Sequence, residues 1–216
     1  MRRLTILLAL LALPLLAACN QVYTRQPLIG EAHEGGDPEF RPGLYSITGY
    51  NPDNCIFDIR KTLSAWPECA VGVELRRGQM FFVSAHDRAL AQTLRFVDGD
   101  PIIVQGKWHT DVLKDRRAPE PKTTDTPFYG WIYYAVTPTR MDGEGHIREA
   151  TVVQAQCGPL PPPGPGGRGV TDRPFPGLTV VGSDCVAKDL ETVKRVLALS
   201  AGLARPYELK WVRDDP

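Results

Sequence analysis

The chain has 216 residues, a length that fits one domain with short appendages. Its 25 Lys and Arg residues balance 25 Asp and Glu residues, which leaves no electrostatic footprint for nucleic acid, and we predict no nucleic-acid partner. The 20 glycines and 20 prolines indicate many loops.

Residues 1–18 are typical of a signal peptide. Two arginines precede an apolar run from Leu4 to Leu16, which is shorter than the about 20 residues that a membrane-spanning helix needs. The run ends in the tetrapeptide Leu-Ala-Ala-Cys at residues 16–19, which resembles the lipobox of bacterial lipoproteins. The resemblance implies that Cys19 is lipidated and begins the mature chain, which is then anchored to a membrane without spanning it. An ordinary secretory signal, cleaved after small residues, is the alternative.

The same resemblance implies a place in the bacterial cell envelope, facing the periplasm. In that family an Asp after the cysteine favours retention at the inner membrane, and Asn20 stands there instead, so we expect the outer membrane. Residues 19–41 are polar, with glycines, prolines and little periodicity, and we predict a flexible tether. Residues 42–216 then form a single globular domain.

Four further cysteines follow Cys19, and an even number in an oxidising compartment implies two disulfides. Three pairings are open, and we favour the two that are local in sequence, Cys55–Cys69 and Cys157–Cys185. A zinc site would favour CxxC spacings and a reducing compartment. We therefore predict no metal site, and no motif indicates a cofactor.

Alternation of apolar and polar residues predicts a domain that is largely antiparallel β. Strands are expected at 43–50, 70–75, 80–84, 94–97 and 102–108. The clearest hairpin spans residues 128–157, with its turn at Asp142-Gly143.

Helical spacing of apolar residues occurs at residues 54–66 and, more clearly, from Asp184 to Ala201, where Ser183 and Gly202 can cap the ends. A short turn is expected at residues 87–92. The fold class is accordingly α+β: an antiparallel sheet of about six to eight strands, curled into a sandwich or barrel, with the C-terminal helix packed on it.

Residues 158–177 form a loop rich in proline and glycine. Such a composition favours polyproline II structure or disorder rather than a packed core. One hypothesis for function is therefore a purely structural envelope protein, in which this loop docks a protein partner.

Two histidines are candidates for general-base chemistry, and they carry the alternative of a periplasmic hydrolase. His109 and Asp111 begin a long polar loop, and His86 precedes Asp87 after a strand. His109 and Asp111 could act as a general base or as a metal-ligand pair, but we favour a solvated loop with incidental charges. At His86 no catalytic partner is readable and Asp87 is expected to cap the turn that follows, so we assign no catalytic residue.

Aromatic side chains crowd the strand at 128–134 and the end of the strand before it. Trp108, Trp131 and Tyr133 could line an apolar ligand cavity, although such residues more often fill a core. The lead hypothesis is a lipid-anchored envelope protein whose periplasmic domain binds a protein partner or a small amphipathic ligand, with no enzymatic activity.

Overall fold

The structure is a computed structural model, and it describes residues 20–30, 40–48, 55–76, 78–108, 130–160, 171–182, 184–203 and 206–214. For Trp108 it describes the backbone alone. The proposed signal peptide, Cys19, His109 and Asp111 lie outside these residues. In the described part of the chain, no helix combines the length and the apolarity that spanning a bilayer requires.

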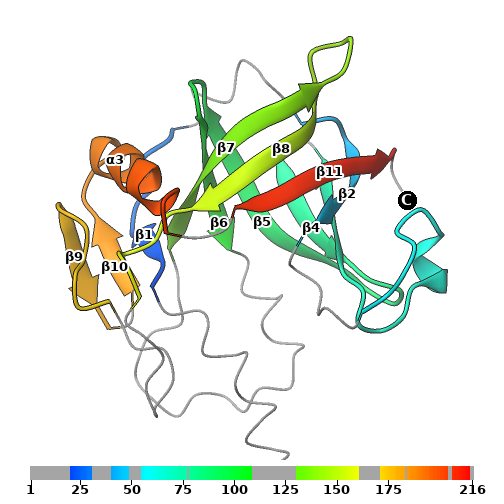
Figure 1. The fold of residues 1–216 in the computed structure, drawn as a ribbon, viewed down its shortest axis with the longest axis horizontal. Coiled ribbons are helices and arrows are strands. Elements are labelled where there is room, and N and C mark those ends of the chain that lie inside the picture. Colours follow the sequence, from blue (N-terminus) through cyan, green and yellow to red (C-terminus); the bar gives the residue numbers. More distant parts are fainter. Residues whose placement is uncertain are drawn as a thin grey trace, which may run out of the picture.

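Eight antiparallel strands close into a barrel (Figure 1). They follow one another around the wall in chain order, and the last strand completes the ring between β8 and β2. The strands are β2 (Gly43–Ile47), β3 (Gly72–Arg76), β4 (Gln79–Val83), β5 (Arg88–Val97), β6 (Ile102–Trp108), β7 (Trp131–Met141), β8 (Ile147–Gln154) and β11 (Tyr207–Arg213). The expected antiparallel β-rich fold is thus confirmed, with far more sheet than helix.

Three short strands extend the sheet beside the barrel. Strand β1 (Val22–Thr24) pairs with the beginning of β7, beyond the point where β8 has ended. Its other edge pairs in parallel with β10 (Asp184–Ala187), and β10 pairs with β9 (Leu178–Val181) at the free edge. Residues 22–24 and residues 178–187, which follow β8 in the chain, therefore share one small sheet.

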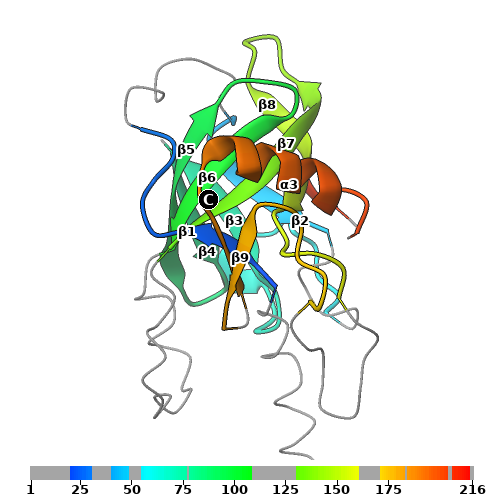
Figure 2. The ribbon, with the colours of Figure 1, turned by 90° about the vertical axis from the view of Figure 1, so that its left-hand side faces the viewer.

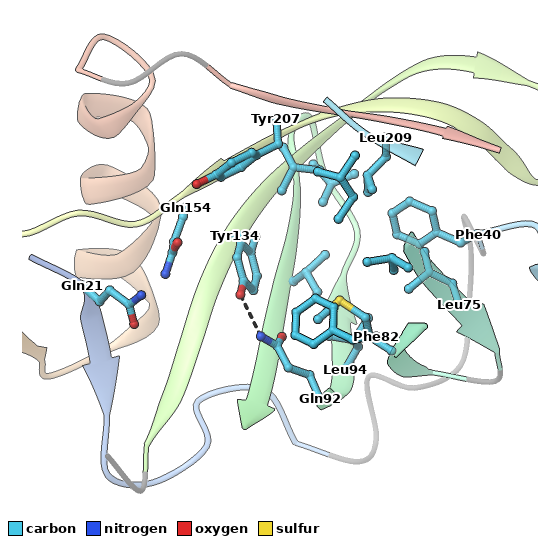
Figure 3. Close-up of a pocket in the computed structure, with 16 residues that line it drawn as sticks. Gln21, Phe40, Leu75, Phe82, Gln92, Leu94, Tyr134, Gln154, Tyr207 and Leu209 are labelled. Carbon is cyan, nitrogen blue, oxygen red and sulfur yellow. Dashed lines mark hydrogen bonds between the residues drawn. The ribbon is translucent and has the colours of Figure 1, made fainter. Parts of the chain in front are cut away.

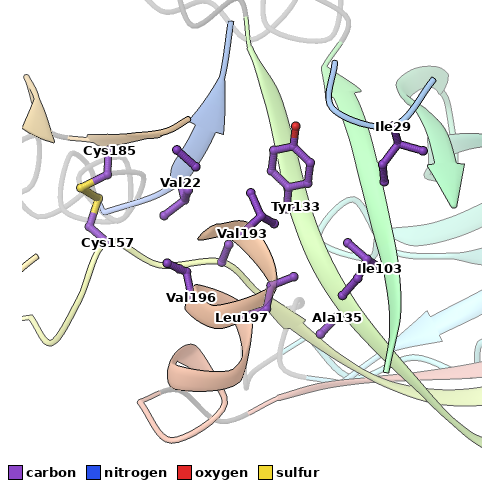
Figure 4. Packing of buried hydrophobic residues seen from close by; sticks show 12 residues of the cluster. Val22, Ile29, Ile103, Tyr133, Ala135, Cys157, Cys185, Val193, Val196 and Leu197 are labelled. Carbon is purple, nitrogen blue, oxygen red and sulfur yellow. A yellow bond between two sulfur atoms is a disulfide. The ribbon is translucent and has the colours of Figure 1, made fainter. Parts of the chain in front are cut away.

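Helix α3 (Leu190–Ser200) crosses the outer face of β7 (Figure 2). We call the buried cluster beneath it the outer core; Figure 4 shows its helix and strand residues in contact. It includes Val22, Tyr133, Ala135, Val193, Val196 and Leu197. The molecule thus has apolar packing on both sides of β7.

The expected helix from Asp184 is corrected, because helix α3 begins at Leu190. Asp189 caps it by accepting a hydrogen bond from the Thr192 amide at 2.8 Å. Residues 184–187 have helical spacing but form β10 instead, since both edges of that strand find partners, β1 and β9. Pairing on both edges outweighs local propensity here.

The helix expected at 54–66 is also corrected: the described residues there contain one 3-10 turn, Leu63–Ala65. Trp66 lies 5.1 Å from the Phe57 ring and packs on the outer face of β2, so the segment forms a cover rather than a helix. The turn expected at 87–92 belongs to β5 from Arg88 onward.

The flexible tether is corrected for residues 20–30, which belong to the folded body. Val22 and Ile29 are each 1% exposed. The side-chain oxygen of Gln105 accepts hydrogen bonds from the amides of Leu28 (2.7 Å) and Ile29 (3.0 Å), so it satisfies backbone groups that no strand partner satisfies. The sequence did not predict this packing, because the segment is polar and has few apolar residues.

Both expected disulfides are confirmed. Cys55 and Cys69 lie 5.8 Å apart at Cα, and Cys157 and Cys185 lie 5.5 Å apart. The first closes the cover over β2, and the second joins the end of β8 to β10. Loops of this length are worth roughly 3 kcal/mol each in the chain-entropy account.

Candidate functional site

The inside of the barrel is not filled. Side chains alternate between the two faces of each strand, so every second residue points inward. The inward residues leave a cavity of about 260 Å³. Its apolar lining is Phe40, Ile47, Val73, Leu75, Met80, Phe82, Leu94, Val104, Val136, Val152 and Leu209.

Aromatic rings close one end of the cavity, which we call the closed end. Phe40 packs edge-on against Tyr45, with ring centroids 5.9 Å apart, and lies 6.2 Å from Phe96. The Tyr45 hydroxyl donates toward the carbonyl oxygens of Arg41 and Ile147. Burial raises the pKa of Tyr45, so this hydroxyl stays protonated as a donor.

Uncharged polar groups gather at the opposite end, which we call the polar end. Figure 3 shows Gln21, Gln92, Gln154 and the Tyr134 and Tyr207 hydroxyls on this side, with Phe40 and Leu75 on the other. Among the described lining residues none is charged. The cavity therefore suits a molecule with an apolar body and a neutral polar head.

Gln92 is the most buried of these polar groups, with 0% exposure. Its Nε2 donates to the Tyr134 hydroxyl at 2.9 Å, while its Oε1 has no hydrogen-bond partner among the described residues. Gly106 makes room for it, because a Cβ at that position would collide with Oε1. The polar end thus contains a buried hydrogen-bond acceptor, Gln92 Oε1, beside Gly106, where the barrel wall has no side chain.

Two of the three aromatics expected to line the cavity do not, which corrects the prediction. Tyr133 lies in the outer core, where its hydroxyl is 2.6 Å from Thr24 Oγ1 and donates to Gln105 Oε1 at 3.1 Å. Burial raises the pKa of Tyr133 to about 12. Trp131 lies on the same outer face, beneath the Arg95 guanidinium at 5.1 Å. The side chain of Trp108 lies outside the described residues.

The cause of this error is the register of β7. Tyr134 and Val136 point inward, so Trp131, Tyr133 and Ala135, which have the opposite parity along the strand, point outward. Both faces of the strand are apolar because α3 covers one of them, and alternation alone cannot say which face lines a cavity. Gln92, Gln154 and Tyr134 carried no motif that could have marked them in the sequence.

His86, a candidate base, is exposed in the turn between β4 and β5. No hydrogen bond or ion pair of His86 is found within the described chain segments. It lies outside the cavity lining, and His109 with Asp111 falls beyond the described residues. The hydrolase hypothesis gains no support from His86.

Asp142, Glu144 and His146 bring ligand-type atoms within 4.8 Å of one another in the β7–β8 turn. The Asp142 carboxylate accepts hydrogen bonds from the amides of Glu144 (3.0 Å) and His146 (2.9 Å) and pairs with Arg41 at 2.9 Å. Burial alone would raise its pKa, but these partners lower the pKa of Asp142 to about 2. Turn formation therefore accounts for the cluster, as expected for Asp142-Gly143.

Comparison with known proteins adds nothing to these residues: the chain matches no family model, no curated protein and no solved structure.

Proposed function

We propose that this protein is a lipid-anchored binding protein of the bacterial cell envelope, and that its barrel holds a small apolar or amphipathic molecule. The observation that carries the proposal is the closed barrel whose apolar interior leaves a cavity of about 260 Å³, with the polar side chains among its described lining residues gathered toward one end. Small barrels either fill their interior with side chains or hold one small ligand there.

The chemistry of the lining favours binding over catalysis. An apolar ligand gains about 25 cal/mol for each Å² of surface removed from water. Ligand pockets usually measure about 300–1,000 Å³. This cavity of about 260 Å³ lies just below that range, and it fits one alkyl chain or a small ring system. Hydroxyl and amide groups at the polar end would orient the ligand's head group.

Anchoring enters the proposal through Cys19 and the lipobox that precedes it. Two or more acyl chains hold a protein stably at a bilayer, whereas one does not. Metabolic labelling with a palmitate analogue tests this part: the parent chain should become labelled, and the variant Cys19→Ser should not.

Binding is tested on the mature chain, secreted behind a cleavable signal peptide and carrying Cys19→Ser. Titration with the neutral fluorescent probe N-phenyl-1-naphthylamine should show one saturable site. Val136→Trp places a large ring in the cavity and should weaken binding about tenfold or more, as should Leu94→Trp.

The matched control is Thr137→Trp, on the neighbouring exposed position of β7. It should leave probe binding unchanged. A parent chain that binds no probe, or cavity-filling variants that fold and bind as the parent does, would contradict the proposed function.

A further inference from the structure

We infer that the start of the mature chain is fixed to the polar end of the cavity, so that lipid on Cys19 holds this opening against the bilayer, and that the cavity takes an uncharged single-chain amphiphile from that leaflet. The inference rests on the proposed lipidation and binding, and it names the source and class of the ligand.

Asn20 is buried in the folded body, with an exposed fraction of only 4%. Its side-chain Nδ2 donates to the Gly158 carbonyl oxygen at 2.9 Å. One carboxylate oxygen of Asp184 accepts from the amides of Asn20 (3.3 Å) and Gln21 (3.0 Å). These contacts join the chain start to segments more than 130 residues away, since each has a sequence separation of 138 to 164.

The disulfide between Cys157 and Cys185 flanks this segment. The Cys157 amide donates to the Asn20 carbonyl oxygen and the Cys185 amide donates to the Gln21 carbonyl oxygen, each at 2.9 Å. The two cysteines are bonded to each other beside Val22, as Figure 4 shows. Covalently linked segments therefore hold residues 20–21 on both sides. We call the contacts of Asn20 and Gln21 with Cys157, Gly158, Asp184 and Cys185 the clamp, which cannot open without moving a cross-linked pair.

The clamp lies directly beside the polar end of the cavity. Gln21 itself lines the polar end, where Figure 3 places it near Gln154. Cys19 directly precedes Asn20, and successive Cα atoms lie about 3.8 Å apart. A lipid on Cys19 would therefore begin within a few ångströms of the clamp, with no spacer between the bilayer and the opening.

Apolar side chains beside the clamp fit this placement. Val180 and Val181 in β9 are 43% and 39% exposed. Val180 is the register partner of Cys185, which binds the backbone of Gln21. These exposed valines lie in the strand beyond β10, two strands from the segment that follows Cys19, where burial of apolar surface in the headgroup region would add to the anchor.

The ligand class follows from the lining. The described lining residues include no charged side chain, and an unpaired carboxylate or ammonium group would lose its hydration without compensation. The amides of Gln21, Gln92 and Gln154 can bond a hydroxyl-bearing head, as in a monoacylglycerol. A cavity of about 260 Å³ has room for one chain rather than two.

The orientation is tested with the full lipidated protein in vesicles whose lipids carry a nitroxide just below the headgroup. Tyr207→Trp reports on the polar end and Met141→Trp on the far end of β7; both parent side chains are exposed, at 41% and 47%. After subtraction of the parent's fluorescence, Trp at position 207 should be quenched severalfold more than Trp at position 141. Equal quenching of the two would overturn the inference.

A spacer tests the clamp. Ten Gly and Ser residues inserted between Cys19 and Asn20 add a root-mean-square span of roughly 17 Å and should abolish the difference in quenching. The same insertion between Gly143 and Glu144, in the β7–β8 turn, should preserve it. A spacer variant that keeps the full difference would overturn the inference, since the contact would then not depend on the clamp.

The ligand is tested with a monoacylglycerol that carries a diazirine on its chain, photo-cross-linked in vesicles and mapped by mass spectrometry. Cross-links should fall on inward residues such as Leu94 and Val136, and the matching fatty acid should react severalfold less. If the secreted Cys19→Ser chain binds the fluorescent probe but gives no such cross-links, the ligand class inferred here is wrong; if it binds neither, the proposed function is wrong. If that chain is cross-linked but the vesicle-bound protein is not, or if the fatty acid reacts equally well, the further inference alone is wrong.

Discussion

The two faces of β7 carry similar residues but have different surroundings. On the outer face, Tyr133 and Ala135 meet helix α3 and strand β1 in a filled core. On the inner face, Tyr134 and Val136 border an open cavity. The outer face is packed against other elements, whereas the inner face borders the cavity, so under the proposed function stability and binding depend on different faces of one strand.

The difference is clearest for two buried glutamines, both 0% exposed. The oxygen of Gln105, in the outer core, accepts three hydrogen bonds, and its Nε2 donates to the Ile29 carbonyl oxygen. The oxygen of Gln92, in the cavity, has no partner within the described chain. A buried polar group without a partner is costly, so the oxygen of Gln105 stabilises the fold while the oxygen of Gln92 does not.

The largest effect should come from breaking the clamp at the outer core. Replacing Cys157 and Cys185 together by serine should lower the free energy of unfolding by about 2–5 kcal/mol. Hydrogen exchange at Val22–Thr24 should quicken as well, since the clamp holds this strand. Denaturant unfolding and exchange mass spectrometry measure the two effects.

The control is the matching serine pair at Cys55 and Cys69, which lie in the cover over β2. That variant should also lose stability, but exchange at Val22–Thr24 should stay as slow as in the parent after correction for global unfolding. Quickened exchange in both pairs would mean that the chain start has no clamp of its own.

The next prediction compares the loss of stability when each of two leucines is replaced by alanine. Leu197 is 1% exposed in the outer core, and Leu197→Ala should cost about 2–5 kcal/mol because its neighbours cannot collapse into the space. Leu94 already faces an open cavity, so Leu94→Ala removes fewer contacts and should cost about 1 kcal/mol. Equal losses in urea unfolding would show that the cavity is filled in solution by the protein itself.

The two glutamines supply the third test. Gln105→Leu leaves the amides of Leu28 and Ile29 without their acceptor and should cost about 1–3 kcal/mol. Gln92→Leu removes an unsatisfied oxygen and should leave stability within about 0.5 kcal/mol of the parent or raise it. A large loss from Gln92→Leu would indicate that its oxygen has a structural partner.

Local patterns were enough for much of this fold. Alternation located the barrel strands β2 to β8, with only the second half of β5, but it did not predict β11. Asp142-Gly143 located a turn, and spacing favoured the correct cysteine pairs, because each of these signals depends on residues close in the chain. Strands β1 and β9 have three and four residues, and their partners are far away in sequence, so no local signal reveals them. Residues 184–187 have helical spacing and became a strand for the same reason.

The candidate site was harder to predict than the fold. The aromatic strand allowed either a filled core or a cavity, and Trp131 and Tyr133 belong to the core while the cavity lies on the other face of β7. The choice between the two faces depends on α3, which covers the outer face and makes both faces apolar. Only the three-dimensional register separates a tyrosine that fills a core from one that borders a ligand site.

Two adjacent tyrosines give the finest test of this comparison. Tyr133→Phe deletes the hydroxyl that contacts Thr24 and Gln105, and should lower stability by about 1 kcal/mol while leaving probe binding unchanged. Tyr134→Phe removes the partner of Gln92 at the polar end, so a monoacylglycerol should bind several times more weakly, with stability within about 0.5 kcal/mol of the parent. Unfolding curves and ligand titrations of both variants separate the two roles. If Tyr133→Phe weakened binding as much as Tyr134→Phe, the outer core and the cavity would be one coupled site, and the division of labour across β7 would be wrong.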